Sequence, residues 1–437
     1  MLRDAALPPG LAAPSFEARE RAGGRYEGAV WTPEALGGLV ATLAAGAPAL
    51  AELTDERLLD AWVECVAELR EPAARDPALA AALPRLCRLS GEGAEAGLRS
   101  VLGGVGREPA ARLLVEVRRR RARPGGGPVL VVLAANLPGL AVQPLLGLLA
   151  LRRPVLLKSP SAEPLLTPFL VAALGQREPS LAGALAAVTW PGGEPALEAP
   201  VLAAVERVIA YGERESLDDL TRRAPGKVVG YGPKTSLAVI AAEAVSAETA
   251  AGLAADVALF DQRGCLSVAA AYTDGDAAAL ARHLTAALAN LAGRWPPGPP
   301  TAAELAAVQQ VRLEAELRGV NCFQVRKDVA AGTVIVEDRP AFLPSPGLRT
   351  LRVHRLTDLS SLPELLSPWR GRLQGAALAG GAAWALVDAL AQLGVSRCVS
   401  PGELQAADAL WHNGGVHPLD VLAPPRRESL RAGLWVT

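Results

Sequence analysis

The stretch that decides the fold is PVLVVLAANLPGL, residues 128–140. Its first half is an unbroken apolar run of strand length, and Asn-Leu-Pro-Gly then signals a turn. Further strand-like segments follow, separated by segments in which apolar residues recur at helical spacing. They are PVLLKSP (154–160), AAVTWPGG (186–193), RVIAYGE (207–213) and KTSLAVIAA (234–242). This alternation predicts an α/β protein with a parallel, doubly wound sheet.

Two other regions flank the predicted sheet. Residues 1 to about 120 are predicted to be helical, with RLLVEVRRRR (112–121) either the last helix or one strand of a hairpin. A second α/β region follows Cys265 and contains an amphipathic helix at 276–293. Its strands are predicted at 268–274, 332–338, 348–356 and 394–400. The tail from 402 to 422 is loop-like.

Composition and charge exclude several classes of protein. Of the 437 residues 50% are hydrophobic and 20% charged, so neither disorder nor a coiled coil fits. The formal net charge of -1 gives no field that would attract nucleic acid or an anionic membrane. The N-terminus MLRDAALPPG lacks the pattern of a secretory signal, and the longest apolar run, 137–151, is too short to span a bilayer. We therefore expect a cytoplasmic protein with no membrane span and no nucleic-acid partner.

The spacing of cysteines and histidines predicts no metal site. The cysteines contain no CxxC pair, and the histidines show no metal-ligand spacing. These residues are Cys65, Cys87, Cys265, Cys322 and Cys398, and His283, His354, His412 and His417. Free thiols in a reducing compartment are therefore expected.

Lysine is rare in this chain. Of the 44 basic residues only four are Lys, at positions 158, 227, 234 and 327. Lysine is a compact point charge, and each one is a candidate for a role that the wider arginine fork cannot fill. Lys158 ends the strand PVLLKSP, at the sheet edge where doubly wound folds bind nucleotides, although a strand-end lysine can also simply reach solvent. The GxGxxG loop is missing after the first strand, so a dinucleotide would be held differently.

Four other positions carry possible chemistry, each with a structural alternative. Asn136 either makes an Asn-x-Pro turn or donates its amide to an oxyanion. Cys265, in FDQRGCLS (260–267), is either a buried structural thiol or a nucleophile whose own backbone N–H helps bind the oxyanion. His412 and His417, in WHNGGVHPL, either tie down a C-terminal loop or present a functional side chain.

The order of these motifs resembles the aldehyde dehydrogenase superfamily. ANLPG, LLKSPS, TWPGG, AYGE, GPKTSLAVI and FDQRGCLS follow one another as they do there. The AYGE strand, the Asp-Gln-x-Gly-Cys block and the late RCVSPGELQ and WHNGG segments are most similar to the acyl-CoA reductase family of the LuxC type. The resemblance covers roughly residues 100 to 425. It implies two Rossmann-like doubly wound domains with a helical N-terminal region, divided as 1–256, 257–400 and a C-terminal segment 401–437, which would return towards the oligomerisation region.

The resemblance also implies roles for single residues. Cys265 matches the catalytic cysteine and Asn136 the oxyanion-binding asparagine, while His412 is a candidate for proton transfer. Lys158 matches the lysine that binds the adenosine ribose. Cofactor-binding positions would also include Ser159, Ser161, Gly193, Tyr211 and Gly212. Because Ser161 stands where NAD-preferring relatives carry an acidic residue, NADPH is the expected cofactor, with NADH as the alternative.

Departures from the superfamily pattern point to the reaction. Gly230 stands where hydrolytic aldehyde dehydrogenases keep the Glu that activates water. The expected function is therefore NADPH-dependent reduction of an acyl thioester, on coenzyme A or a carrier protein, to the aldehyde. Asn413 stands where Asp is usual and Val268 where Pro is usual, and SPGLRTLRV (345–353) replaces the segment that contacts the nicotinamide ribose.

Two alternatives stay open at this point. One is an ordinary NAD(P)-dependent aldehyde dehydrogenase, and the other is a non-catalytic subunit that binds or scaffolds an acyl-transfer partner. Relatives of this fold pair through an exposed hairpin, so a homo-oligomer is expected, with residues 112–128 as the candidate hairpin. A partner protein in acyl transfer is also expected.

Overall fold

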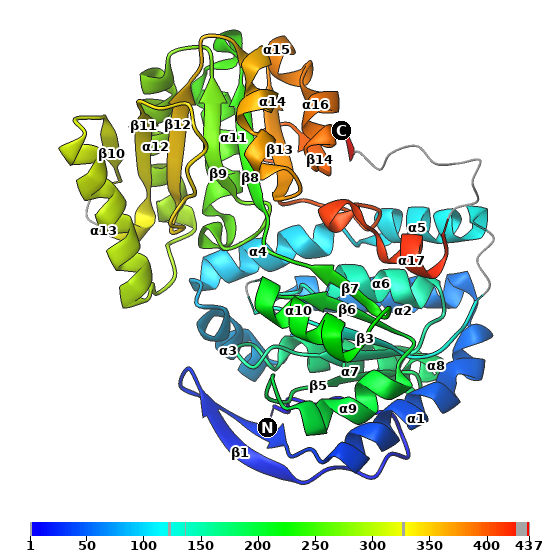
Figure 1. Ribbon diagram of the computed structural model, residues 1–437. Coiled ribbons are helices and arrows are strands. Elements are labelled where there is room, and N and C mark those ends of the chain that lie inside the picture. Colours follow the sequence, from blue (N-terminus) through cyan, green and yellow to red (C-terminus); the bar gives the residue numbers. More distant parts are fainter. Residues whose placement is uncertain (1, 121–123, 136, 326–327, 425–434, 437) are drawn as a thin grey trace.

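The computed structural model describes residues 2–120, 124–135, 137–325, 328–424 and the backbone of 435–436. It has two lobes, each built around its own largely parallel sheet, with helix α4 (Gly91–Gly103) at the seam between them (Figure 1). We call them the nucleotide lobe, below in this view, and the cysteine lobe, above.

The nucleotide lobe contains a five-stranded parallel sheet. Its strands are β3 (Val129–Val132), β4 (Val155–Lys158), β5 (Leu185–Val188), β6 (Arg207–Tyr211) and β7 (Val228–Tyr231). Their spatial order is β5-β4-β3-β6-β7, so the chain moves outward from β3 to one edge and then resumes on the other side at β6. The point of reversal lies between β3 and β6, which is where ligands bind in such sheets. The predicted doubly wound sheet is confirmed.

Helices cover both faces of this sheet because its strands are apolar on both sides. Alternate strand residues pack against two separate sets of helices. One set is α6 (Val142–Ala150) and α7 (Leu166–Arg177), and the other is α1 (Pro33–Ala51) and α9 (Pro195–Ala204). In the described part of the chain α1 is the one helix long and apolar enough to cross a membrane, and here Leu36, Leu39 and Leu43 pack in the core beneath β4.

The cysteine lobe contains an eight-stranded sheet of order β10-β11-β12-β9-β8-β13-β14-β15, parallel except at the β10–β11 pair. Its strands are β8 (Thr235–Ile240), β9 (Val268–Thr273), β10 (Cys322–Gln324), β11 (Thr333–Glu337), β12 (Thr350–Arg355), β13 (Leu373–Ala379), β14 (Arg397–Val399) and β15 (Trp435–Val436). Helices α11 (Ala247–Ala258) and α12 (Ala277–Arg294) pack on one face. The predicted second sheet is confirmed. Strand β8, which the sequence groups with the first sheet, pairs with β9 and β13, because a pattern of apolar residues does not say which sheet a strand joins.

The N-terminal region is mostly helical, as predicted. Besides α1 and α4 it holds α2 (Asp55–Arg70), α3 (Pro77–Cys87) and α5 (Arg107–Arg119). Ahead of them, β1 (Phe16–Arg21) and β2 (Gly24–Ala29) form an antiparallel hairpin that the sequence pattern missed because its strands are rich in charged residues.

The prediction of an oligomerisation hairpin strand that begins at residue 112 was wrong. Arg107–Arg119 is helix α5, because Ala110, Leu113, Leu114 and Val117 fall on one helical face and are buried there. The oligomeric state stays a prediction.

The C-terminal segment, residues 401–424, runs back along the seam between the lobes (Figure 1). Arg112 pairs with Asp408 at 2.8 Å and Arg120 pairs with Asp420 at 2.8 Å, which ties the segment to α5. Helix α17 (Pro418–Leu422) packs against α6. One stretch of chain therefore contacts both lobes.

Candidate active site

The turn before Cys265 has an unusual backbone. Phe260, Asp261 and Gln262 all have left-handed φ values, of 58°, 50° and 63°. Each such residue costs roughly 1–2 kcal/mol when it is not glycine, so the turn persists only if its surroundings hold it.

Two side chains of this turn supply that restraint. Asp261, which is buried, accepts hydrogen bonds from Arg349 Nε at 2.9 Å and from the Gly298 N–H at 2.9 Å. Gln262 Nε2 donates to Val268 O at 2.7 Å, and its Oε1 accepts from the Thr350 N–H at 2.8 Å. The Asp-Gln pair of FDQRGCLS therefore fixes the path of the chain into Gly264 and Cys265. Arg349 escaped the sequence analysis because it lies far from the motif that it holds.

Cys265 lines a cavity of about 650 Å³ at the seam between the lobes. The other residues that line it include Leu137, Tyr211, Tyr231, Lys234, Gln374 and Asn413. Burial raises the pKa of the Cys265 thiol to about 11, against the opposing effect of the backbone N–H groups of Cys265 and Leu266 and the charge of Lys234. The sulfur thus faces a cavity, and its reactivity depends on the groups that offset desolvation.

A second cavity, of about 610 Å³, lies at the carboxyl ends of the strands of the nucleotide lobe. Lys158 is buried there, with Nζ 5.3 Å from the centroid of the Trp190 ring. Burial lowers the pKa of Lys158, and Glu198 opposes this effect. Glu198 accepts from Trp190 Nε1 at 2.9 Å and pairs with Arg223 at 2.7 Å.

These two cavities meet at Tyr211 and Gly212, which line both. The Tyr211 ring is buried and stacks on Tyr231 with 4.8 Å between ring centroids. Its side chain hydrogen-bonds to Asn413, which also accepts from Gln374 Nε2 at 2.6 Å. A ligand that fills the nucleotide cavity would therefore reach Cys265 past the carboxyl end of β6.

The residues in the nucleotide cavity fit a dinucleotide. Ser159 Oγ and Arg223 Nη2 are buried without a hydrogen-bond partner among the described residues. A side chain at Gly192 or Gly193 would meet nothing within 4 Å, so the loop leaves open space beside the strand ends. Unpaired donors next to open space are what a phosphate-bearing ligand requires.

The structure brings several of the predicted residues together. Lys158, Gly193, Tyr211 and Gly212 line the nucleotide cavity. Ser159 is buried just beyond β4, whereas Ser161 is exposed. Asn136 lies outside the described residues, so its predicted role stays a prediction.

The histidines of the C-terminal segment bind neighbours in that segment. His412 Nε2 lies 3.1 Å from Asp420, and its neighbour Asn413 lines the cysteine cavity. His417 is buried, donates from Nε2 to Ala409 O at 2.9 Å and accepts the Leu419 N–H at Nδ1. Burial lowers the pKa of His417 to about 4, so it is neutral near pH 7. His412 as a proton donor stays a prediction.

Gly230 is exposed at the end of β7, and a Cβ added there would meet Leu217 at 3.4 Å. In the described structure Gly230 does not line the cysteine cavity, whereas the neighbouring Tyr231 does. Glycine at this position supplies no carboxylate.

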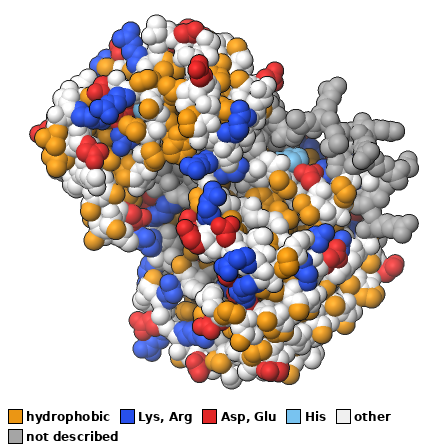
Figure 2. All heavy atoms as spheres, viewed as in Figure 1, with side chains coloured by type: hydrophobic (Ala, Val, Ile, Leu, Met, Phe, Trp, Pro, Cys, Tyr) orange, Lys and Arg blue, Asp and Glu red, His pale blue; other side chains and the backbone are white. Residues whose placement is uncertain are grey.

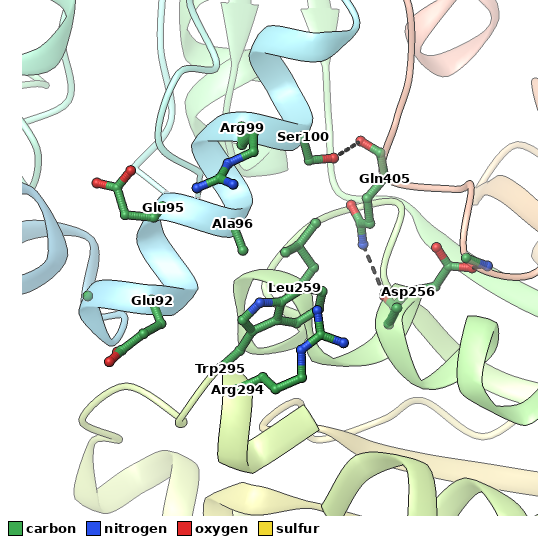
Figure 3. Close-up of a pocket in the computed structure, with 13 residues that line it drawn as sticks. Glu92, Glu95, Ala96, Arg99, Ser100, Asp256, Leu259, Arg294, Trp295 and Gln405 are labelled. Atoms are coloured by element: carbon green, nitrogen blue, oxygen red, sulfur yellow. Dashed lines mark hydrogen bonds between the residues drawn. The ribbon is translucent and has the colours of Figure 1, made fainter. Parts of the chain in front are cut away.

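A third cavity, of about 750 Å³, lies between α4 and the cysteine lobe (Figure 3). Ala96, Arg99 and Ser100 face it from α4, and Leu259 and Trp295 face it from the other side. Gln405 borders this cavity and also donates from Nε2 to Ser267 Oγ at 3.0 Å. We call this cavity the α4 cavity; the buried Gln405 stands between it and Ser267, in the loop that carries Cys265. The sequence analysis missed Gln405, although it lies in the quoted RCVSPGELQ segment.

Charged side chains near the seam do not form a patch of one sign. On the face shown in Figure 2, acidic and basic residues are interspersed between the two lobes. Among the described residues, no cluster of histidine, cysteine and carboxylate side chains could hold a metal ion.

Comparisons with known proteins agree with this architecture. The sequence profile of the family described as acyl-CoA reductase (LuxC) matches residues 113–424. The long-chain acyl-protein thioester reductase of Aliivibrio fischeri is 27% identical over 321 residues, which are 70% of this chain and 63% of that protein. The protein of the same name from Vibrio harveyi is 23% identical over 318 residues, 69% of this chain and 62% of that protein. Each match thus spans less than two thirds of the relative's length.

Solved structures show the fold. Aldehyde dehydrogenase 21 from Physcomitrella patens, in complex with the reaction product succinate, superposes with a TM-score of 0.71 at 15% identity, covering 94% of this chain and 92% of that one. Methylmalonate-semialdehyde dehydrogenase from Oceanimonas doudoroffii gives 0.69 at 14% identity, covering 92% and 89%. With a matching family profile over most of its length and an aldehyde dehydrogenase-like fold, this chain belongs to the acyl-CoA reductase (LuxC) family.

Proposed function

We propose that this chain reduces an acyl thioester to the aldehyde with NADPH, through an acyl group held on Cys265. The observation that carries the proposal is the continuity of the nucleotide and cysteine cavities at Tyr211 and Gly212. The names of the two relatives, both acyl-protein thioester reductases, support the same reaction.

In the first step the Cys265 thiolate attacks the thioester carbonyl. A bond forms between the sulfur and the acyl carbon, the bond to the carrier sulfur breaks, and the carrier thiolate takes up the proton that Cys265 lost. The predicted oxyanion donors are the Cys265 backbone N–H and the Asn136 amide.

In the second step the acyl carbonyl on Cys265 is reduced. A reduced nicotinamide dinucleotide held by Lys158 and the other residues of the nucleotide cavity would supply the hydride. The thiohemiacetal then collapses, the aldehyde leaves, and Cys265 is released as the thiolate. A thioester suits this step because its carbonyl stays more electrophilic than that of an oxygen ester.

Hydrolysis of the acyl group competes poorly in this site. The resemblance places Gly230 where hydrolytic relatives carry a general base, and this glycine is exposed and has no side chain to act as one. Without that carboxylate water attacks the acyl group slowly, so the group leaves as aldehyde.

Two features support NADPH over NADH. Ser161 brings no negative charge to the position that repels a 2′-phosphate in NAD-preferring relatives. Arg223 lines the nucleotide cavity and keeps one buried nitrogen without a partner in the described structure. The guanidinium, which also pairs with Glu198 and Asp219, brings positive charge to the wall of the cavity and thus favours a 2′-phosphate there.

The α4 cavity is the proposed site for the acyl chain. Gln405 links its wall to Ser267 of the cysteine loop, and Ala96, Leu259 and Trp295 give it an apolar part among charged side chains at its rim. An acyl-protein or acyl-coenzyme A donor, a homo-oligomer, an acyl-transfer partner and a cytoplasmic location stay predictions.

One assay tests the reaction. The purified protein is mixed with acyl-coenzyme A or an acyl-carrier protein and with NADPH or NADH, while absorbance at the reduced nicotinamide band and the mass of the protein are followed. The expected result is an acyl adduct on Cys265 and aldehyde formation, faster with NADPH. Oxidation of aldehyde to free acid, with no adduct from any thioester, would instead identify an ordinary aldehyde dehydrogenase. No turnover in either direction would leave only a binding subunit.

A further inference from the structure

The three described lysines of this arginine-rich chain lie in three different settings. Lys158 is in the nucleotide cavity. Lys227 lies outside helix α9 and caps its C-terminal end, where Nζ donates to the backbone carbonyls of Leu202, Ala203 and Val205 at 2.8 to 2.9 Å. Lys234 lines the cysteine cavity, where neither the comparisons nor the sequence analysis gave it a role.

The backbone around Lys234 is fixed next to Cys265. Lys234 directly precedes β8, and Ser236, two residues later, donates from Oγ to the Cys265 carbonyl at 2.8 Å. Ser236 Oγ also accepts from the Gly375 N–H at 3.0 Å. The start of β8 and the cysteine loop are thus joined directly.

The Lys234 side chain is held in the cavity by the C-terminal segment. Nζ donates to the Gly414 carbonyl at 3.3 Å. Gly414 has a φ of 59°, and a Cβ at this position would lie 3.4 Å from Lys234 Cε. Glycine here lets the backbone pass close to the lysine.

The Lys234 ammonium has no carboxylate partner in the part of the chain that the structure describes. The other titratable groups lining the cavity are Tyr211, Glu213, Tyr231 and Arg263, and Arg263 is engaged with Glu304 at 3.3 Å. Burial lowers the pKa of Lys234 while Cys265 opposes this, so a negative sulfur and a positive Lys234 favour one another.

We propose that the Lys234 ammonium stabilises the thiolate of Cys265. The charge assists the sulfur as nucleophile, and, if the proposed reduction holds, assists it again as the group expelled when the aldehyde leaves. No proton passes to Lys234 in either step, because it keeps its charge and acts through the field at the sulfur.

Alkylation of Cys265 tests this without substrate or cofactor. The rate of reaction with iodoacetamide is measured from pH 6 to 10, with the modified residue identified by mass. Lys234→Met should move the rise of the profile to higher pH and slow alkylation at pH 7 by about tenfold or more, the effect of one pKa unit. Lys234→Arg should restore most of the rate.

Two further variants keep the test decisive. Lys234→Gln can still donate to Gly414 O, so it should fold like the parent protein yet share the slow alkylation. Lys227→Met removes a lysine remote from the sulfur and should leave the profile unchanged. If Lys234→Met and Lys234→Gln both alkylate with the parent profile, the proposal is wrong, whatever the reductase assay shows.

Discussion

The nucleotide cavity and the α4 cavity are built differently. The first adjoins the cysteine cavity at Tyr211 and Gly212, and the second is separated from the cysteine loop by Gln405. In the first, Lys158, Trp190 and Glu198 are buried at the ends of parallel strands; Trp190 donates to Glu198, and the Lys158 ammonium lies over the Trp190 ring. In the second, Arg99 and Arg294 are exposed on helices, and Gln405 makes the link to the loop.

This difference separates two tasks. Buried polar groups in a low-dielectric setting hold one ligand in one orientation, because each unpaired group would be costly. Side chains on an exposed helix can change without disturbing the cysteine. If the acyl chain occupies the α4 cavity as proposed, acyl specificity can vary there while the nucleotide cavity and the loop stay constant.

The largest expected effect is that of replacing Cys265, the proposed nucleophile. Cys265→Ala should abolish the acyl adduct and lower thioester reduction by more than about 10³-fold, because no other group can carry the acyl chain. Mass spectrometry and aldehyde formation measure it. Cys322→Ala, which changes a partly buried cysteine in β10, should retain activity. Full activity of Cys265→Ala would remove the nucleophile from this mechanism.

A change on the nucleotide side should affect the cofactor alone. Lys158→Met removes a buried charge beside Glu198 and should raise KM for NADPH by about 10- to 100-fold, the worth of a charged hydrogen bond. Steady-state kinetics give the value. Acylation of Cys265 without cofactor should proceed at the parent rate. A slowed acylation step would show that the two cavities are not independent.

A change on the α4 side should affect the acyl chain alone. Ala96→Trp places a large ring in the α4 cavity and should lower kcat/KM for long-chain thioesters by about tenfold, with short chains spared. A series of acyl-coenzyme A chain lengths measures this. Glu92→Gln, at the same cavity, serves as a control that changes charge but not bulk. An equal loss at every length would mean that the chain lies elsewhere.

The smallest expected effect concerns the C-terminal segment, which lines the α4 cavity with Gln405 and the cysteine cavity with Asn413. Burial depresses the pKa of His417 to about 4, so its contribution to stability is complete above pH 6.5 and is lost as the pH falls from there towards 4. His417→Gln has no such titration. Its thermal midpoint should therefore drop by a few degrees less than that of the parent between pH 7.5 and pH 5. Parallel decreases in both proteins would place the acid sensitivity at other groups.

Sequence patterns predicted local elements of the chain better than contacts between residues that are distant in sequence. Lys158 ends a strand in a chain with few lysines, so a local signal was enough to single it out. Cys265 and Tyr211 were assigned roles only by the resemblance in motif order. The placement of β8, by contrast, depends on which strand it pairs with. The N-terminal hairpin has charged strands that carry no apolar alternation to detect.

The residues that contact and position the site residues could not be predicted from the sequence either. Arg349, Gln405 and Gly414 act on the cysteine loop or on Lys234 from distant parts of the sequence. No spacing rule connects such residues, because the contacts exist only once both sheets have formed. Local sequence patterns can identify candidate functional residues, whereas the residues that position them are known only from the tertiary structure.

The left-handed turn at 260–262 affects the stage of folding at which the active site forms. Its residues seldom visit that conformation in an unfolded chain, and the groups that enforce it, from Arg349 and Gly298, arrive later in the sequence. We expect Cys265 to remain an ordinary, accessible thiol during synthesis, until β12 docks. The nucleophile would then be assembled last, so that a partly folded chain cannot capture an acyl group that it has no means to reduce.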